Sequence, residues 1–399
     1  MLNSQMVDFG RRSSTIRNFF EYGKKRRQIV GEENVFDFSL GNPSVPTPSA
    51  VTEALIDVLS HRSPIEIHGY TPSAGDIEAR EAIAADISRR IGRKFCSRNI
   101  YLTCGAAASL ASCIKAFLLD SSSEIIAIAP FFPEYISFVT GLGGVIKIVP
   151  PKVDDFQIDL PALEKLITSK TQAVIINSPN NPSGAVYTRK TLCGLSEILM
   201  RKSSQYRHAI YLLSDEPYRE LVYDGLEVPF VPDIYPNTII CYSYSKSLSL
   251  PGERIGYMFV PDTVEDFDGV CWATSGAARV MGYVCAPALI QKAVALCASV
   301  PTDLESYDRN RRLLYGELTS MGYDCCHPDG AFYLFVKAPN GLSSVEFSEL
   351  AKNEDLLLVP GDDFGCPGFL RISYCVSFEM IKRSIPTFRH LIEISGCPD

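Results

Sequence analysis

The sequence predicts an α/β protein in which a mostly parallel sheet is covered by helices on both faces, with a smaller α+β domain after it. The middle of the chain holds short apolar runs, and each run is continuous rather than alternating in polarity. Continuous runs of this length are typical of strands with both faces buried. Strands are therefore expected at 125–129, 145–149, 173–177, 209–214, 238–243 and 255–260.

Helical segments separate or follow these strands, and this order favours parallel pairing. Helices are expected at 11–30, 76–92, 160–169, 188–203 and 285–299. Between the first two lies a Gly/Pro-rich passage at 41–48, which must be an extended loop.

The last hundred residues change in pattern and predict a separate α+β unit. Helices are expected near 303–321 and 344–353, and strands at 331–336 and 369–374. The N-terminal segment is expected to join this unit, because chain termini often pack together. The predicted division is an N-terminal arm with part of the small domain (1–48), a large domain (49–295) and a C-terminal small domain (296–399).

Composition argues against several classes of partner. The 399 residues carry a net charge of -8, which suits neither nucleic acid nor another polyanion, and the basic run 24–27 is interpreted as a solvated helix face. No apolar stretch reaches about 18 residues, and the N-terminus lacks a secretory apolar core, so no membrane partner is expected. The 13 cysteines form no C-x-x-C pair and the five histidines show no ligand spacing. We expect buried reduced thiols, a cytoplasmic location and no metal site.

Polar clusters follow three of the predicted strands, at 177–184, 214–218 and 243–256. Singly, each has an ordinary interpretation as a turn, a helix cap or a surface lysine. Because parallel strands end at one edge of a sheet, where ligands bind in such folds, the three together indicate a functional site.

These clusters resemble the class I aminotransferases, which are fold-type I enzymes dependent on pyridoxal 5'-phosphate. The resemblance covers nearly the whole chain. It is carried by the stretch S-x-S-K-x5-G-x-R-x-G at 243–256, by N-P-x-G at 181–184 and by D-x-x-Y at 215–218. It implies a mixed seven-stranded sheet, a homodimer with shared sites, and transfer of an α-amino group between an L-amino acid and a 2-oxo acid.

The resemblance also assigns catalytic and ring-binding residues. Lys246 matches the lysine that forms the Schiff base and later moves the α-proton, which requires a partly neutral amine. Asp215 matches the carboxylate that keeps the pyridine nitrogen protonated. Asn181 and Tyr218 match the groups on the cofactor's 3-oxygen, and Phe132 matches the aromatic stacked on the ring.

The phosphate group requires a dianion site, and the segment 103–109 resembles a strand-to-helix turn with free amides. The residues matched to phosphate binding are Gly105, Ala106, Ala107, Ser243, Ser245, Arg254 and Tyr70. Arg254 would give a bidentate contact, and Tyr70 matches a tyrosine that reaches the neighbouring subunit's phosphate.

Substrate recognition requires a cation for the α-carboxylate. Arg371, in an apolar strand, matches that arginine, and Gly41 and Asn181 are placed beside it by the same resemblance. Arg279 lies about 25 positions after the phosphate arginine, where aspartate aminotransferases carry an arginine that binds the side-chain carboxylate in the other subunit's site. It therefore suggests aspartate and 2-oxoglutarate as substrates, although the residues after it depart from the family pattern and a structural or interface role is the alternative.

Three other interpretations remain. A C–S (β-) lyase on the same scaffold would carry the same cofactor residues. A serine acyl-enzyme would explain S-x-x-K at 243–246, but its S-D-N and K-T-G partners are absent. A non-enzymatic regulator that binds the cofactor would need an additional basic DNA-binding domain, for which about 30 residues before the family core leave no room.

Overall fold

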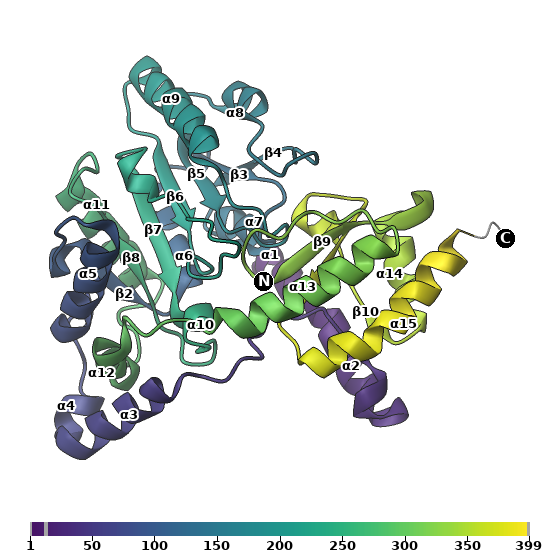
Figure 1. Cartoon of the computed structure of the whole chain (residues 1–399). Helices are drawn as coiled ribbons and strands as arrows, with labels where there is room; N and C mark the ends of the chain where they lie inside the picture. The colour runs from purple at the N-terminus through teal and green to yellow at the C-terminus, as the bar shows by residue number, and fades with distance from the viewer. Residues whose placement is uncertain (1, 12–14, 397–399) are drawn as a thin grey trace.

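The computed structural model describes residues 2–11 and 15–396. A large sheet wrapped by helices lies beside a smaller α+β unit, and the two are coloured teal-green and yellow-green in Figure 1. The predicted fold class is confirmed, and the boundaries proposed after residues 48 and 295 stay a prediction.

The large sheet has seven strands and is mixed. Its order is β2 (Ile100–Thr103), β8 (Gly256–Phe259), β7 (Thr238–Ser243), β6 (Tyr211–Asp215), β5 (Thr171–Asn177), β3 (Glu124–Ile128) and β4 (Val145–Val149). Strand β8 runs antiparallel to both neighbours, and every other pairing in this sheet is parallel. The ends of β2, β5, β6 and β7 therefore meet at one edge.

Both faces of the sheet are buried, as the continuous apolar runs predict. In β3, Ile125 and Ala127 pack on the side of α6 (Ala106–Phe117) and α7 (Glu134–Gly141), whereas Ile126 and Ile128 pack toward α8 (Leu160–Leu166) and α9 (Arg189–Tyr206). The prediction was wrong for β4, whose Val145 is 41% exposed. Strand β4 is the edge of the sheet, so it has a neighbour on one side only.

The remaining helices of the large unit lie around this sheet (Figure 1). They are α3 (Ser49–His61), α4 (Pro64–His68), α5 (Ile77–Ile91), α8 (Leu160–Leu166), α9 (Arg189–Tyr206), α10 (Tyr244–Ser247), α11 (Phe267–Val280) and α12 (Ala288–Cys297). Helix α5 agrees closely with its predicted range because both ends carry signals. Asp76 caps its N-terminus by accepting from two backbone amides, and Gly92 ends it in the left-handed conformation.

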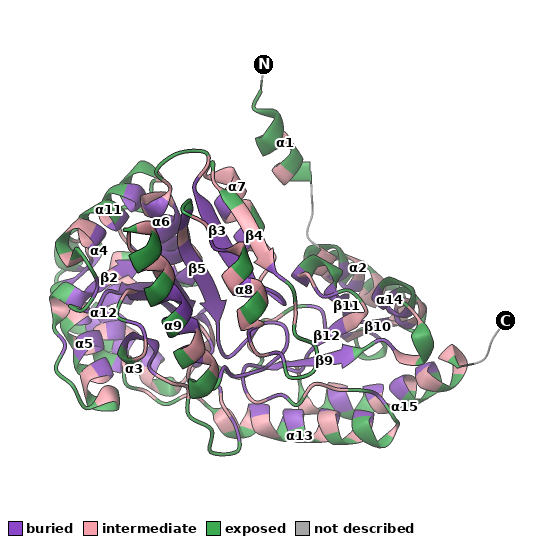
Figure 2. Cartoon of the chain, turned by 90° about the horizontal axis from the view of Figure 1, so that it is seen from above, coloured by how far each residue is buried: buried purple, intermediate pink, exposed green. Residues whose placement is uncertain are grey.

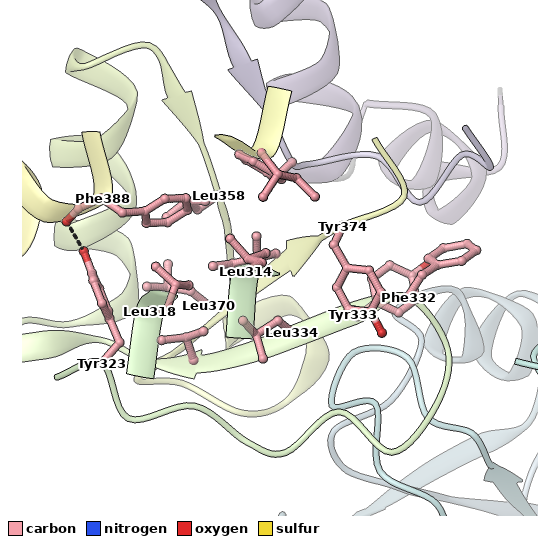
Figure 3. Close-up of a cluster of buried hydrophobic side chains, with 14 of the residues drawn as sticks. Leu314, Leu318, Tyr323, Phe332, Tyr333, Leu334, Leu358, Leu370, Tyr374 and Phe388 are labelled. Carbon is pink, nitrogen blue, oxygen red and sulfur yellow. Dashed lines mark hydrogen bonds between the residues drawn. The ribbon is translucent and has the colours of Figure 1, made fainter. Parts of the chain in front are cut away.

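The smaller unit surrounds a second apolar core (Figure 3). Its elements are α13 (Leu304–Ser320), β9 (Tyr333–Lys337), α14 (Ser344–Asn353), β10 (Leu356–Leu357), β11 (Val359–Pro360), β12 (Phe369–Ser373) and α15 (Phe378–Ser395). The order β11-β12-β9 is antiparallel throughout. Tyr323 contributes its ring to this core, and its hydroxyl donates to the carbonyl of Phe388 at 2.8 Å.

Residues 15–37 pack on this smaller unit, whereas residues 4–11 contact α7 of the large unit. Helix α1 (Ser4–Arg11) is set apart from the smaller unit in Figure 2, and its Gln5 side chain donates to the carbonyl of Thr140 on α7 at 3.2 Å. Residues 12–14 of the predicted helix 11–30 lie outside the described residues, and α2 (Thr15–Val30) follows them. Strand β1 (Phe36–Asp37) then pairs in parallel with β10. The interpretation of the basic run 24–27 as a solvated helix face holds for Lys24 and Lys25, which are exposed. It does not hold for Arg26, which pairs with Asp355 at 2.6 Å, or for Arg27, which pairs with Asp37 at 3.0 Å.

The twelve described cysteines are free thiols, as the sequence suggests. Five of them are buried and five are half-buried. The expectation of burial was wrong for Cys96 and Cys193, which are exposed because they stand in a loop and on the outer face of α9. None of the helices in the described ranges is long and apolar enough to cross a lipid bilayer. Nor do the described residues contain a group of histidine, cysteine or acidic side chains arranged to hold a metal ion.

Candidate active site

A cavity of about 300 Å³ opens where strands β5, β6 and β7 end and helix α6 begins. It brings together twelve of the residues predicted from the sequence. They are Gly41, Ala106, Ala107, Phe132, Asn181, Asp215, Tyr218, Ser243, Ser245, Lys246, Arg254 and Arg371. They come from the N-terminal loop, the large sheet and the small sheet, so the cavity lies between the two units.

Lys246 reaches this cavity from the short helix α10, directly after β7. Ser243 caps that helix by accepting from the amide of Ser245. The Lys246 ammonium donates to the carbonyl of Gly41 at 2.6 Å. Burial is the main reason why the pKa of Lys246 is lowered to about 8, with Cys375 acting against this shift and Arg371 and Arg254 acting with it. The amine is therefore neutral far more often near pH 7 than that of an ordinary lysine, whose pKa is 10.5.

Asp215 is the last residue of β6 and is buried. Its Oδ2 accepts from the Tyr135 hydroxyl at 2.5 Å, whereas its Oδ1 has no hydrogen-bond partner among the described residues. Burial raises the pKa of Asp215 to about 7, although the Tyr135 hydrogen bond acts in the opposite direction. A buried carboxylate oxygen without a partner fits a cationic hydrogen-bond donor in the cavity.

Two residues that support Asp215 were missed as site residues. Tyr135, near the start of α7 and three residues after Phe132, was given no role, because its local pattern is the same as that of a core tyrosine. Asn177 was noted within its strand-end cluster without a role. Its side chain donates to the Asp215 carbonyl at 2.8 Å and accepts from the amide of Asn181 at 2.7 Å. Asn177 therefore ties the ends of β5 and β6 together.

The start of α6 forms an anion cradle. Gly105 is the N-cap at φ 88°, where no side chain caps the free amides of the first turn. A Cβ on Gly105 would lie 2.8 Å from Nη2 of Arg254, and one on Gly256 would lie 2.2 Å from the carbonyl oxygen of Tyr242. Arg254 also donates to the carbonyl of Cys104 at 2.9 Å, which holds the guanidinium beside the cradle.

Ser243 and Ser245 complete the polar lining of this end of the cavity. Their hydroxyl oxygens are 2.7 Å apart, and both residues are buried. The free amides, the two hydroxyls and the permanently charged guanidinium together form a donor set that suits a phosphate group.

Arg371 lies on β12 at the opposite side of the cavity and is 2% exposed. It donates to Oδ1 of Asn181 at 3.1 Å and to the carbonyl of Ser39, and its Nε has no hydrogen-bond partner. None of the described carboxylates pairs with it, and burial lowers its pKa. A buried guanidinium that is only partly satisfied favours an anionic ligand.

Tyr70 and Arg279 do not line the cavity. Tyr70 is fully exposed, and Arg279 is exposed at the end of α11. Both were predicted to act on the site of a neighbouring subunit, so their roles stay predictions. Gly105 stands just behind the cavity wall as the N-cap of α6.

Comparison with known proteins agrees with this arrangement. The family model "Aminotransferase class I and II" matches residues 33–387. Aromatic-amino-acid aminotransferase 2 of Thermococcus litoralis is 30% identical, over 95% of this chain and 96% of that protein. Aspartate aminotransferase of Thermotoga maritima is 30% identical, over 91% and 92%.

Solved structures give the same result. A crystal structure of an amino transferase from Eubacterium rectale is 50% identical, covers the whole of both chains and has a TM-score of 0.97. Aspartate aminotransferase of Thermus thermophilus with maleate is 27% identical, over 98% of this chain and 99% of that one, with a TM-score of 0.84. The chain belongs to the class I and II aminotransferases, a family of enzymes that use pyridoxal phosphate.

Proposed function

We propose that this chain binds pyridoxal 5'-phosphate in the cavity and transfers the α-amino group of an L-amino acid to a 2-oxo acid. The observation that carries the proposal is the presence, in one cavity, of a lysine amine with a lowered pKa and a buried carboxylate oxygen without a partner. A cofactor with an aldehyde and a protonated ring nitrogen satisfies both groups.

The lining residues fit that cofactor at each of its functional groups. The amides of α6, the hydroxyls of Ser243 and Ser245, and Arg254 would hold the phosphate. Asp215 would face the ring nitrogen, with Phe132 stacked on the ring. Asn181 and Tyr218 would donate to the 3-oxygen. When bound, the cofactor supplies an electron sink for the bond that breaks at the α-carbon.

Lys246 would hold the cofactor covalently and then act as the base for the α-proton. Its amine is close to half neutral near pH 8, so it can accept a proton without a large energetic penalty. The Gly41 carbonyl, 2.6 Å away, orients the amine toward the cavity.

Arg371 would bind the substrate α-carboxylate. Asn181, which accepts from the Arg371 guanidinium, would fix its orientation. The apolar side chains of Ile16 and Leu40, at the N-terminal side of the cavity, would limit the access of water. Binding by Arg371 orients the α-carbon between Lys246 and the cofactor, which is the geometry the proton transfer requires.

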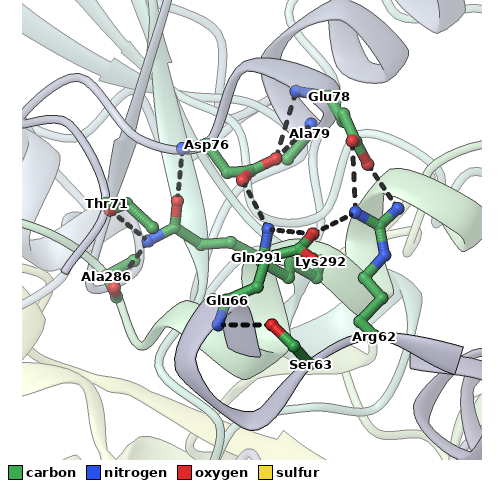
Figure 4. A network of polar contacts seen from close by, with 10 residues as sticks. All are labelled: Arg62, Ser63, Glu66, Thr71, Asp76, Glu78, Ala79, Ala286, Gln291 and Lys292. Carbon is green, nitrogen blue, oxygen red and sulfur yellow. Dashed lines mark hydrogen bonds and ion pairs between the residues drawn. The ribbon is translucent and has the colours of Figure 1, made fainter. Parts of the chain in front are cut away.

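A homodimer with shared sites is part of this proposal. Figure 4 shows how the segment around Tyr70 is held. Gln291 accepts from the amide of Asp76 at 2.7 Å and donates to Thr71 at 3.3 Å, and the Lys292 ammonium binds Asp76 at 2.9 Å. This network fixes a fully exposed tyrosine at the surface, as expected of a residue that completes a second subunit's phosphate site.

We propose aspartate and 2-oxoglutarate as the pair to test first. Within the cavity, Arg371 would take the α-carboxylate and Arg254 the phosphate, so a side-chain carboxylate needs another cation. The exposed Arg279 of a second subunit is the candidate, and several relatives are named aspartate aminotransferases. The free cysteines support a reducing, cytoplasmic environment for this reaction.

Borohydride reduction and peptide mapping test the proposal directly. The protein should carry one pyridoxyl group, on Lys246, and lose it in Lys246→Ala but not in Lys170→Ala, which alters an exposed lysine. A group on another residue, or none, would refute the proposal.

A screen of twenty amino acids, scored by loss of the cofactor's visible band, identifies the donor. Release of pyruvate and ammonia without a 2-oxo acid would indicate the C–S lyase instead.

A further inference from the structure

Tyr333 is a cavity residue that was not predicted from the sequence. It is the first residue of β9, is 2% exposed and lines the cavity with its side chain. Figure 3 shows it at the end of the small-domain core, next to Phe332 and Tyr374. Unlike the other aromatic residues of that core, it contacts three of the groups assigned to the reaction.

The first contact joins the two units of the fold. The hydroxyl oxygens of Tyr333 and Tyr218 are 2.9 Å apart, and their rings meet edge to face. Tyr218 follows β6 of the large sheet, whereas Tyr333 belongs to the small sheet. Burial raises the pKa of Tyr333 to about 12 and also raises that of Tyr218 well above its ordinary value, so both phenols remain protonated at neutral pH.

Each phenol has one proton, and this determines the direction of the hydrogen bond. If Tyr218 donates its proton to the cofactor's 3-oxygen, it can only accept from Tyr333. Hydrogen bonds arranged in such a chain polarise one another, so Tyr333 would strengthen the donation by Tyr218.

The second and third contacts involve Arg371 and Gly41. The Arg371 guanidinium lies 4.7 Å from the centre of the Tyr333 ring, within the range of a cation–π contact. A Cβ added to Gly41 would lie 2.1 Å from the Tyr333 hydroxyl oxygen, so glycine is required for this close approach. The charged and titratable groups that face Tyr333 are Arg371, Tyr218 and Cys375.

We propose that Tyr333 is a positioning residue with two separable parts: its hydroxyl holds Tyr218 for donation to the cofactor's 3-oxygen, and its ring holds Arg371 for the substrate carboxylate. This inference rests on the proposed function and adds a residue to it. The hydroxyl part acts on the cofactor, whereas the ring part acts on substrate binding.

Two substitutions separate these parts. Tyr333→Phe removes the hydroxyl and keeps the ring. Donation by Tyr218 stabilises the ionised 3-oxygen. It therefore favours loss of the proton from the Lys246 nitrogen that holds the cofactor. The pH midpoint of the bound cofactor's visible absorbance should therefore rise by roughly 0.5 to 1 unit in Tyr333→Phe, the size of one hydrogen bond. Its kcat should fall several-fold with KM nearly unchanged. Tyr333→Leu removes the ring too and should raise KM about tenfold or more.

Tyr323→Phe is the matched control, because it removes another buried tyrosine hydroxyl from the same core and leaves the cavity untouched. Its midpoint and KM should equal those of the unaltered protein. In the double variant Tyr218→Phe/Tyr333→Phe, the midpoint should not exceed that of Tyr218→Phe alone, since the two hydroxyls act in series.

The outcomes distinguish this inference from the proposed function. An unaltered protein without a visible cofactor band would overturn the proposed function itself. If the band is present but Tyr333→Phe leaves its midpoint unchanged, the hydroxyl part is refuted. Additive shifts in the double variant would likewise refute it, and an unchanged KM in a folded Tyr333→Leu would refute the ring part.

Discussion

At the scale of single residues, burial decides the chemistry of this site. Lys246 and Asp215 have pKa values displaced in opposite directions, one to about 8 and the other to about 7, and burial is the largest cause for both. Each displacement disfavours the charged form. The cofactor proposed here would supply the opposite charge that Asp215 lacks, so the empty and the loaded protein should differ in their response to pH.

That difference can be measured through the free energy of unfolding. An ionised Asp215 without a cation lowers the stability of the folded protein, and its pKa is raised from the ordinary 3.8 to about 7. Between these values the folded state keeps a proton that the unfolded state loses, so the stability of the cofactor-free protein should fall as pH rises from about 4 to about 7. The contribution is on the order of 4 kcal/mol at most. Denaturant titrations should show this slope, and Asp215→Asn should remove it. Equal slopes in both proteins would contradict the assignment.

Tyr135 should matter through the same carboxylate. Its hydroxyl donates to Oδ2 of Asp215 at 2.5 Å and favours the ionised form. In Tyr135→Phe the acidic limb of the kcat profile should move to higher pH, and kcat at neutral pH should fall about tenfold or more, the size of a hydrogen bond to a charged group. Tyr235→Phe loses a buried hydroxyl bond to the Ile210 carbonyl on the other face of the sheet and is the control. A profile identical to that of this control would exclude the role of Tyr135.

At the scale of elements, the agreement between prediction and structure follows local signals. Helix α5 carries a side-chain cap and a C-terminal glycine, and its prediction was accurate. Helix α9 was expected to end at 203 but continues to Tyr206, because it ends at Arg207 in the left-handed conformation without a glycine to mark it. Helix α11 was not predicted, since its glycine, serine, threonine and valine residues are weak helix formers and its packing against α6 supplies the stability.

The close approach of β8 to the start of α6 is an element-scale feature with a direct test. In Gly256→Ala the new Cβ would lie 2.2 Å from the Tyr242 carbonyl oxygen and 2.8 Å from the Cα of Gly105. Backbone must move in either case, so cofactor affinity should fall at least about tenfold and Tm should drop by several degrees. Gly252→Ala is the matched control, because nothing lies within 4 Å of its Cβ position. Fluorescence titration with pyridoxal phosphate measures both, and equal affinities would exclude a role for the close approach.

At the scale of the whole molecule, the site is built from segments far apart in the chain. Arg371 of the small sheet donates to Asn181 of the large unit, and the Gly41 carbonyl accepts from Lys246. Movement of one unit against the other would change these contacts together. The proposed binding of substrate at Arg371 would therefore be coupled to the packing of the two units.

Sharing of sites between subunits predicts complementation. Lys246→Ala and Tyr70→Ala should each be nearly inactive, but after mixing and exchange of subunits one site of each hybrid dimer contains both Lys246 and Tyr70. Activity should therefore return on mixing. A mixture as inactive as its components, with exchange shown by mass spectrometry, would exclude the shared site.

In the same dimer, Arg279→Ala should lower kcat/KM for aspartate more than for a neutral amino acid, and equal losses would remove the dicarboxylate assignment.

The sequence by itself determined the sheet and most of the cavity, because buried parallel strands have continuous apolar runs and the residues at their ends follow in fixed order. Within the polar clusters at those strand ends, the resemblance to class I aminotransferases assigned Lys246, Asp215, Asn181 and Arg254. Only the tertiary structure brought Tyr135 to Asp215 and Tyr333 to Tyr218, pairs that are 80 and 115 residues apart. A buried tyrosine has the same local pattern whether its hydroxyl is in the core or in the site. The difference depends on which distant element packs against it, and local sequence contains no record of that.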